Sequence, residues 1–138
     1  QSQICSGACS VSQAAAAAAL NGPQDDVRRF CAAFDERCNL VVERISQIDG
    51  LTLDPPGDFY GLIGCADLIG AQTTGGNTLS DDAEIIAYIL KDVSIAAVSG
   101  SAYELSPFFC ISTAALMVVL DQAMDRIATS VAKLKRKT

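Results

Sequence analysis

The sequence predicts an α+β fold, in which a long linker helix is followed by a small sheet packed against helices. Two apolar stripes with helical spacing, at residues 27–48 and 116–134, predict a long helix and an amphipathic final helix. Three runs rich in β-branched and aromatic residues, at 59–63, 95–98 and 108–112, predict strands. With two further helices, the expected order is helix, long helix, strand, helix, strand, strand, helix.

The first helix is expected to begin at Ser12, whose side chain can accept hydrogen bonds from the open N–H groups, and to run through Leu20. Residues 1–10 show little periodicity and predict an irregular or extended lead-in. Alanines from Ala14 onward form the body of the helix, because alanine is the strongest helix former. Such a surface of small side chains allows close packing against another surface, which we expect to lie outside this chain.

The second helix is expected to start at Pro23, a residue favoured at the first helical position, and to end at Gly50. Asp25 and Asp26 in its first turn complement the helix dipole. Because apolar residues recur every three or four positions between these ends, this is expected to be the longest helix of the chain.

Strands, loops and a third helix are expected to fill the middle of the chain. Residues 51–57 predict a loop or short strand, and residues 70–77 predict a loop rich in glycine and threonine. Ser80 is expected to cap a helix that buries Ile85, Ile86 and Ile89.

The composition is typical of a globular domain and favours neither nucleic acid nor membrane as a partner. The 138 residues are 50% apolar and 19% charged, which suffices for one compact domain. No apolar run approaches the ~20 residues that cross a bilayer, and a net charge of −6 disfavours nucleic acid. The basic residues 133–137 are expected to close the last turn of a helix rather than to bind phosphate or a membrane. The chain begins at Gln1 without a methionine, which suggests a truncated or processed product.

Cysteine is abundant and histidine is missing, which limits the metal and redox chemistry available. No two cysteines have the Cys-x-x-Cys spacing of zinc or thioredoxin-type sites, so no metal site is predicted. The count would allow disulfides, but two cysteines seven residues apart on the long helix are separated by ~10 Å, beyond disulfide reach. We therefore expect reduced thiols and a cytoplasmic location. The six cysteines are Cys5, Cys9, Cys31, Cys38, Cys65 and Cys110.

Three short motifs, taken in order, resemble a known family. Residues 58–60 read Asp-Phe-Tyr, residues 97–103 read Ala-Val-Ser-Gly-Ser-Ala-Tyr, and residues 108–113 read Phe-Phe-Cys-Ile-Ser-Thr. The series resembles the C-terminal part of fold-type I aminotransferases, close to the aspartate aminotransferase group. There it reads roughly Gly-Ala-Phe-Tyr, then Val-Ala-Val-Val-x-Gly-Ser-Ala-Phe, then Phe-Arg-Ile-Ser-Tyr-Ala.

The resemblance implies three parts and places the cofactor site elsewhere. Residues 1–22 would be a remnant of the family's large domain, 23–50 the helix that links the domains, and 51–138 the α+β small domain. The pyridoxal phosphate site, with its Schiff-base lysine, would lie upstream of all of them. The lysines present lie outside the family's lysine motif, so we expect no catalytic residue and no cofactor in this chain. They are Lys91, Lys133, Lys135 and Lys137.

Cys110 stands where the resemblance places the arginine that holds the substrate's α-carboxylate. A guanidinium makes two parallel charge-assisted hydrogen bonds to a carboxylate, which a thiol cannot do. We expect Cys110 to be a small buried thiol beside Phe108 and Phe109 rather than a reactive or metal-binding cysteine, because no histidine is available as a base.

Other positions depart from the family pattern as well. Cys38 lies in an Arg-Cys-Asn run where the family commonly reads Arg-Arg-Asp, and Thr113 replaces a tyrosine. Phe59 and Tyr60 keep the family's aromatic character and are expected to pack in the core. The departures suggest relaxed functional constraint.

A glycine-containing run and an acidic cluster are each explained by local structure rather than by ligand binding. The run Thr-Gly-Gly-Asn at residues 74–77 is too weak a pattern for a phosphate-binding loop, because it lacks the lysine of a P-loop. Asp81, Asp82 and Glu84 could form a cation site, but acidic side chains at a helix start are sufficiently explained by the helix dipole.

The sequence therefore predicts the C-terminal domain of an aspartate aminotransferase-like protein, catalytically inactive as an isolated chain. Two alternatives remain open. The chain could be an interaction or oligomerisation module that self-associates, or binds a large-domain partner chain, through the helix between Ala14 and Leu20. It could also be one half of a split aminotransferase.

Overall fold

The computed structural model describes residues 7–53 and 59–136. Within these ranges the chain divides into two units, which meet between Ala33 and Phe34 and are called unit 1 and unit 2 below. The boundaries inferred from the resemblance, at residues 22 and 50, stay a prediction.

Helix α1 of unit 1 spans Ser10–Asn21 and buries none of its residues. It begins two residues before Ser12, so the predicted cap is wrong. Cys9 occupies the N-cap position without a capping side-chain bond, and the Gln13 side chain instead donates to the Ala8 carbonyl over 2.7 Å. The alanine run is strong enough as a helix former to extend the helix without a serine cap.

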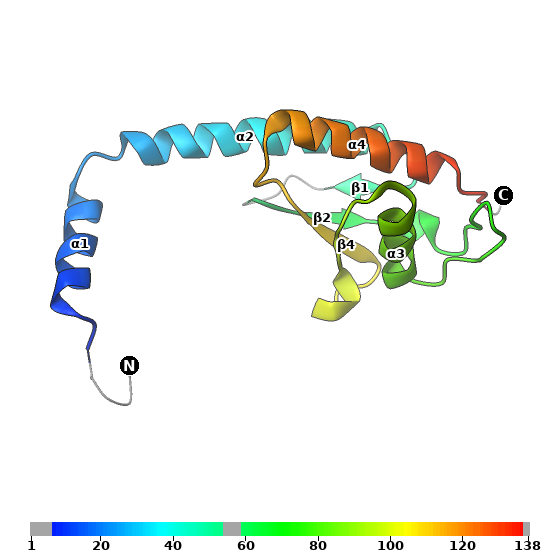
Figure 1. Ribbon diagram of the computed structural model, residues 1–138, viewed down its shortest axis with the longest axis horizontal. Helices are drawn as coiled ribbons and strands as arrows, with labels where there is room; N and C mark the ends of the chain where they lie inside the picture. Colours follow the sequence, from blue (N-terminus) through cyan, green and yellow to red (C-terminus); the bar gives the residue numbers. More distant parts are fainter. Residues whose placement is uncertain (1–6, 54–58, 137–138) are drawn as a thin grey trace. The chain divides into compact units, whose positions relative to one another are not determined.

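Helix α2 spans Asp25–Ser46 and is the longest helix of the described chain (Figure 1). Asp25 and Asp26 lie in its first turn as predicted, whereas Pro23 precedes the helix instead of opening it. The helix ends four residues before Gly50, which adopts a positive φ of 89° in the turn toward the sheet.

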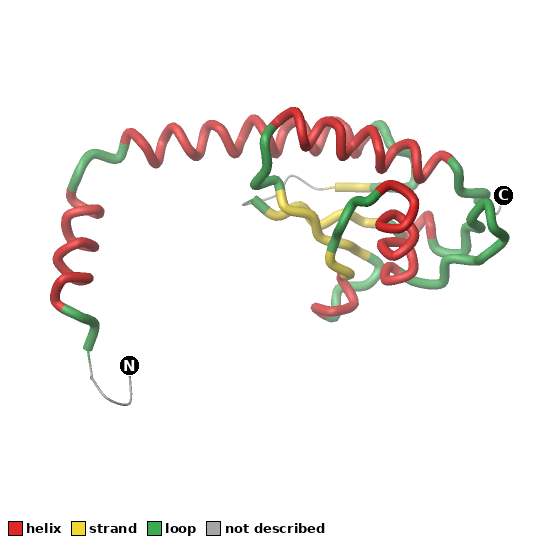
Figure 2. Tube along the Cα trace, in the orientation of Figure 1, coloured by secondary structure: helices red, strands yellow, loops and turns green. Residues whose placement is uncertain are grey.

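The sheet has four antiparallel strands in the order β1-β2-β4-β3 (Figure 2). These are β1 (Thr52–Leu53), β2 (Tyr60–Gly64), β3 (Val98–Ser99) and β4 (Phe108–Ser112). The pair β2–β4 is the most extensive, with Ile63 opposite Phe109. The predicted α+β architecture, a small sheet covered by helices, is confirmed.

One face of the sheet carries the core of unit 2. Alternate residues of β2 and β4 are buried against the second half of α2, against α3 (Asp82–Val93) and against α4 (Met117–Ala132). Figure 1 shows α4 and the second half of α2 running along the same side of the sheet. The largest buried apolar side chains are Val41, Ile45, Ile63, Leu68, Ile85, Ile89, Phe109, Met124 and Ile127.

Three predicted core residues are exposed. Phe59 and Tyr60 expose 40% and 53% of their surface, and Leu116 exposes 67%. Tyr60 lies opposite Ser112 on the face of the sheet that the helices do not cover, and Leu116 precedes the first turn of α4. These three residues lie at or next to the start of β2 or α4. Their hydrophobicity matched the pattern predicted for the core, but their side chains do not face it.

Helix α3 begins one residue later than predicted. Asp81, not Ser80, is its N-cap, and the Asp81 side chain accepts from the Glu84 N–H over 2.8 Å. The Glu84 side chain in turn accepts from the Ser80 N–H over 2.6 Å. Together the two carboxylates satisfy two backbone donors at the helix start, much as in a capping box.

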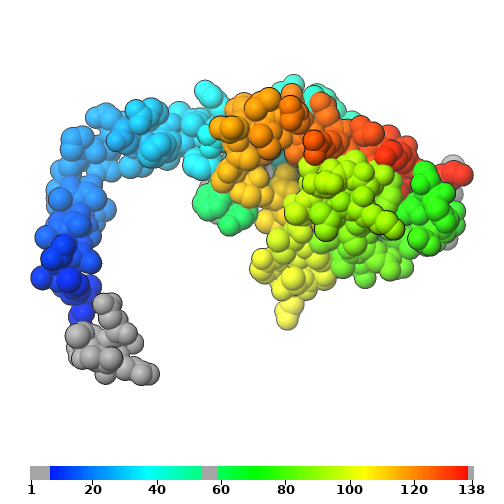
Figure 3. Space-filling model, viewed as in Figure 1, coloured from blue at the N-terminus to red at the C-terminus, as the bar shows by residue number. Residues whose placement is uncertain are grey.

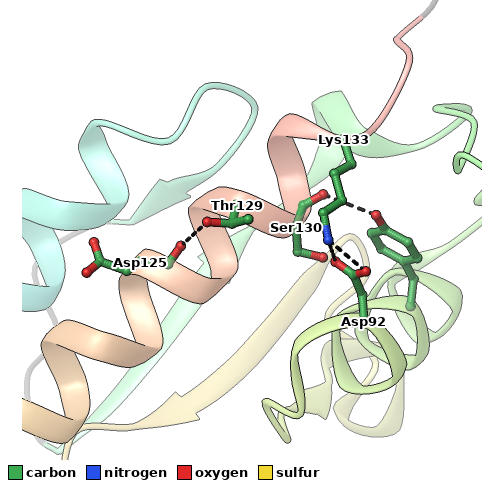
Figure 4. A network of polar contacts seen from close by, with 6 residues as sticks. Asp92, Asp125, Thr129, Ser130 and Lys133 are labelled. Carbon is green, nitrogen blue, oxygen red and sulfur yellow. Dashed lines mark hydrogen bonds and ion pairs between the residues drawn. The ribbon is translucent and has the colours of Figure 1, made fainter.

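Lys133 is the C-cap residue of α4 and its N–H donates to the Ser130 carbonyl over 3.2 Å, so the predicted closing of the last turn holds for Lys133. Lys135 and Arg136 lie beyond the helix and make other contacts. Lys133 contacts Asp92 of α3 over 2.8 Å (Figure 4), which lowers the pKa of Asp92 and raises that of Lys133. Lys135 exchanges backbone hydrogen bonds of 2.8 and 2.9 Å with Gln72, and Arg136 pairs with Asp49 over 2.6 Å. The tail thereby ties three separate segments of unit 2 together.

Asp82 is a buried carboxylate that holds the connection between β3 and β4 against α3. It is fully inaccessible and accepts hydrogen bonds from the Ser106 hydroxyl (2.7 Å), the Ser101 N–H (2.9 Å) and the Ser99 hydroxyl. The helix dipole alone is therefore not a sufficient explanation for this residue. Burial by itself raises the pKa of Asp82, but the hydrogen bonds outweigh burial and leave it well below the usual value.

Replacing Asp82 by alanine should lower the free energy of unfolding at neutral pH by about 3 kcal/mol, because three donors lose a charged acceptor. Asp67→Ala, which removes an exposed carboxylate, should change it by less than about 0.5 kcal/mol. Urea unfolding followed by circular dichroism measures both. Equal small effects would contradict a stabilising role for Asp82.

The same contribution should depend on pH. Because the native pKa is lowered, the stabilisation is complete above the unfolded-state value of about 3.9 and is lost as the pH falls toward the native value. The unfolding free energy of the unmodified chain should therefore decrease more steeply below about pH 5 than that of Asp82→Ala. Parallel curves for the two proteins would count against this assignment.

Candidate functional site

Cys110 lies in the middle of β4, on the face of the sheet opposite the core. Its Cα is paired with Leu62 of β2 on one side and with Val98 of β3 on the other. The side chain is half-buried rather than buried as predicted. The reason is the alternation along β4, which turns the neighbouring Phe109 and Ile111 into the core and Cys110 away from it.

The face around Cys110, called the outer face below, is apolar and uncharged. Tyr60, Leu62 and Val98 expose between 37% and 53% of their surface on it. None of the residues that form β2, β3 and β4 carries a charge. The strands of the outer face therefore present hydrophobic contact area and contribute no charged group of their own to bind an ionised substrate.

An aromatic cluster lies at the start of β2, beside this face. The Phe59 ring lies 5.8 Å from that of Phe34 and 4.6 Å from that of Tyr60, between ring centroids. The Arg37 guanidinium stacks over Phe34 at 5.1 Å from its centroid. These distances are those of favourable aromatic and cation–π contacts, so the cluster gives this end of unit 2 a defined shape.

Two residues that the resemblance marks as departures from the family pattern are neighbours in space. Cys38 of α2 and Thr113 after β4 approach each other to 3.8 Å between sulfur and hydroxyl oxygen. Thr113 is fully buried, and both its N–H (2.8 Å) and its hydroxyl (3.1 Å) donate to the Phe59 carbonyl. The two small side chains thus share one site next to the aromatic cluster. Their proximity could not be predicted from the sequence, because they are 75 positions apart.

The residues of the outer face do not fit pyridoxal phosphate. The cofactor requires a lysine for a Schiff base, an acid for the ring nitrogen and donors for its phosphate. Lys133 is held by Asp92 on the far side of the core, and Lys135 is bound through its backbone to Gln72. No group of three potential metal ligands exists in the described chain.

Cys65 is a buried thiol that the sequence did not single out. It donates a hydrogen bond of 3.3 Å to the Pro107 carbonyl. Burial, with a smaller contribution from the nearby Asp82 carboxylate, raises its pKa to about 11. The thiol is therefore protonated at neutral pH and is inert, since the thiolate is the nucleophile.

Alkylation should consequently discriminate among the cysteines. Cys9 and Cys31 are exposed and should react with iodoacetamide at neutral pH well before Cys65. Peptide mass spectrometry at increasing reaction times gives the order, and denaturant should abolish the difference. Early modification of Cys65 in the folded chain would contradict its burial and raised pKa.

The predicted loop at residues 70–77 is confirmed and lines a groove. The groove has a volume of about 750 Å³ and lies between this loop and α3. Thr74 and Thr78 contribute to one wall, and Tyr88 and Lys91 to the other. The structure thus brings a lysine next to a loop whose sequence contains none.

Comparison with known proteins places the chain. No family model matches it. It is 44% identical over 135 residues to the aspartate aminotransferase of Rhizobium meliloti strain 1021, and 38% identical over 128 residues to the aspartate/prephenate aminotransferase of Cereibacter sphaeroides. These alignments cover 97% and 92% of the chain. The chain spans only 33% and 32% of the two relatives' lengths.

Solved structures agree with the sequence relatives. The crystal structure of the aspartate aminotransferase from Rhizobium meliloti matches with a TM-score of 0.90 at 43% identity, over 97% of this chain and 34% of that one. The aspartate aminotransferase from Thermotoga maritima matches with a TM-score of 0.71 at 28% identity, over 93% and 30%.

The α+β architecture and these matches define the class: the chain has the fold of the small domain of fold-type I aminotransferases. More narrowly, it corresponds to the C-terminal part of the aspartate aminotransferase-like proteins and belongs to that family. Within the described residues, no helix is long and apolar enough to cross a membrane.

Proposed function

We propose that the chain supplies the small domain of a protein that exchanges amino groups between an amino acid and a 2-oxo acid, and that it does not catalyse this reaction by itself. The observation that carries the second part is the outer face. The resemblance implies that Cys110 stands where the family has its carboxylate-binding arginine, and its strand neighbours are Leu62 and Val98. A thiol among apolar side chains offers an α-carboxylate neither charge nor paired donors.

The lysines support the same proposal. None of the lysines within the described chain lies on a strand of the sheet. Lys91 lines the groove beside α3, Lys133 pairs with Asp92, and Lys135 is bound through its backbone to Gln72. The chain's own residues are therefore suited to shape one wall of a substrate site. They are not suited to hold the cofactor that supplies the chemistry of amino-group exchange.

Addition of pyridoxal phosphate to the purified chain tests this proposal. We expect no turnover of an amino acid with a 2-oxo acid, and no absorbance band of a stable lysine-linked cofactor. Borohydride reduction followed by peptide mapping distinguishes one specific lysine from scattered surface labelling. A single labelled lysine together with turnover would overturn the proposal.

A second candidate function is that of an interaction module, and α1 favours it. The helix exposes every residue, with Val11 and Leu20 exposed by 74% and 80%. An exposed helix surface of alanine and larger apolar side chains tends to be covered by a partner or by self-association. Self-association, or binding to a separate large-domain chain, would cover it.

Sedimentation at several protein concentrations tests self-association. The unmodified chain should associate as concentration rises, and Leu20→Glu should remain monomeric because it places a charge on the α1 surface. Leu90→Glu makes the same chemical change at an exposed leucine of α3 and serves as the control. A strictly monomeric chain at all concentrations would count against the self-association form of the module.

The split-enzyme alternative is tested by mixing the chain with a separately expressed large domain. If the upstream two-thirds of a relative is supplied as a separate chain, Cys110 should give weak binding of the substrate carboxylate, and Cys110→Arg should strengthen it. Lack of any binding between the two chains would exclude this alternative. A cytoplasmic location is proposed on the content of reduced cysteines alone.

A further inference from the structure

The groove between the loop of residues 70–79 and α3 is built on fixed elements. Gly70 and Leu79 close the loop by a backbone hydrogen bond of 2.7 Å, and Gln72 is bound to Lys135 of the tail on its other side. In Figure 3 the green loop and the yellow-green α3 lie together on the face shown. The volume of about 750 Å³ is within the range of small-molecule sites.

The loop wall offers donors that the loop itself does not use. Three hydrogen bonds close the turn, and they use the N–H groups of Thr73, Gly76 and Asn77. The N–H groups of Thr74 and Gly75 donate no hydrogen bond within the described chain, and both residues line the groove. Unused N–H groups at a tight turn, with threonine hydroxyls beside them, form a concavity suited to an anion.

The helix wall supplies a cation to the same groove. Lys91 lines it, and within the described residues Lys91 makes no ion pair, whereas Lys133 and Arg136 do. A lysine ammonium is a compact point charge, which suits the several oxygens of a phosphate better than the planar pair of a carboxylate.

Two carboxylates also line the groove, and their positions limit how far they oppose an anion. Asp92 is neutralised by two bonds to the Lys133 ammonium, of 2.8 and 2.9 Å. Glu84 accepts from the Ser80 N–H over 2.6 Å. It precedes Lys91 by seven positions, which is about 10 Å along the helix axis. The Lys91 end of the groove is thus the end where an anion meets a cation.

We propose that this groove binds the phosphate group of a small phosphate ester, held by Lys91 and by the Thr74–Gly75 turn. The groove is larger than a phosphate ion. Leu79, Ala87 and the half-buried Tyr88 line its remainder and provide contact area for the organic part of the ligand. The site is independent of the outer face and of any aminotransferase activity.

Titration of the isotopically labelled chain with inorganic phosphate, and separately with glycerol phosphate, tests the proposal by amide NMR at constant ionic strength. Saturable shifts are expected at residues 73–78 and at Lys91, with a dissociation constant on the order of 1 mM for the ester and weaker for phosphate. Shifts that do not saturate, or that spread over the basic tail, would overturn the site.

Matched variants separate specific binding from general charge. Lys91→Gln should weaken binding about tenfold, the effect of one charge-assisted hydrogen bond, while Lys91→Arg retains most of it. Lys135→Gln removes the same charge from an exposed tail position and should change nothing. Because Lys91 is exposed, its variants should keep the amide spectrum of the folded chain. Unaltered affinity in Lys91→Gln, or an equal loss in Lys135→Gln, would refute the proposal.

Discussion

The pairing of β2 with β4 is the contact on which the rest of unit 2 depends. It is the longest register in the sheet and places Ile63, Phe109 and Ile111 on one side, where three helices bury them. Because side chains alternate along a strand, the same register fixes what the opposite side presents. Cys110 and Leu62 lie on the uncovered face for the reason that Phe109 and Ile63 lie in the core. The candidate site and the core are two consequences of a single pairing.

Periodicity predicted the existence and type of most elements, and end chemistry explains most of the errors. The strand Phe108–Ser112 has the predicted bounds, and both amphipathic stripes form helices, α2 and α4. The stripe of α4 is largely buried from Leu120 onward, whereas α2 buries only Val41 and Ile45 and leaves the start of its stripe exposed. The errors are of two kinds: the choice of the residue that caps a helix, and the choice of the sheet face on which a side chain lies. Asp81 rather than Ser80 caps α3, because its carboxylate reaches the Glu84 N–H. Phe59 and Tyr60 were assigned to the core because hydrophobicity indicates burial without indicating which face of a sheet is covered.

The functional positions were predictable only where one motif contained them. Cys110 could be identified from its own neighbours in sequence. Cys38 and Thr113 could not be recognised as partners, because the fold brings them together from 75 positions apart. The position of Lys91 next to the loop could not be predicted for a related reason. Lys91 belongs to helix α3 and not to the loop sequence, and only the fold places it at the groove. Asp82 was indistinguishable in sequence from its solvent-facing neighbours, and only the β3–β4 connection folding over it makes it the centre of a hydrogen-bond cluster.

The contacts between α2 and the end of unit 2 have a kinetic consequence. Arg44 of α2 pairs with Asp121 and Asp125 of α4, and Arg136 pairs with Asp49, 87 positions earlier. Closing loops of this length costs conformational entropy, and this cost comes before the contacts can form and stabilise the chain. Folding therefore slows as the average sequence separation of native contacts grows. Unit 2 is therefore expected to fold through a transition state that already joins its two ends. Its rate should respond to changes in the long-range seam between α2 and α4 more than to changes within α3.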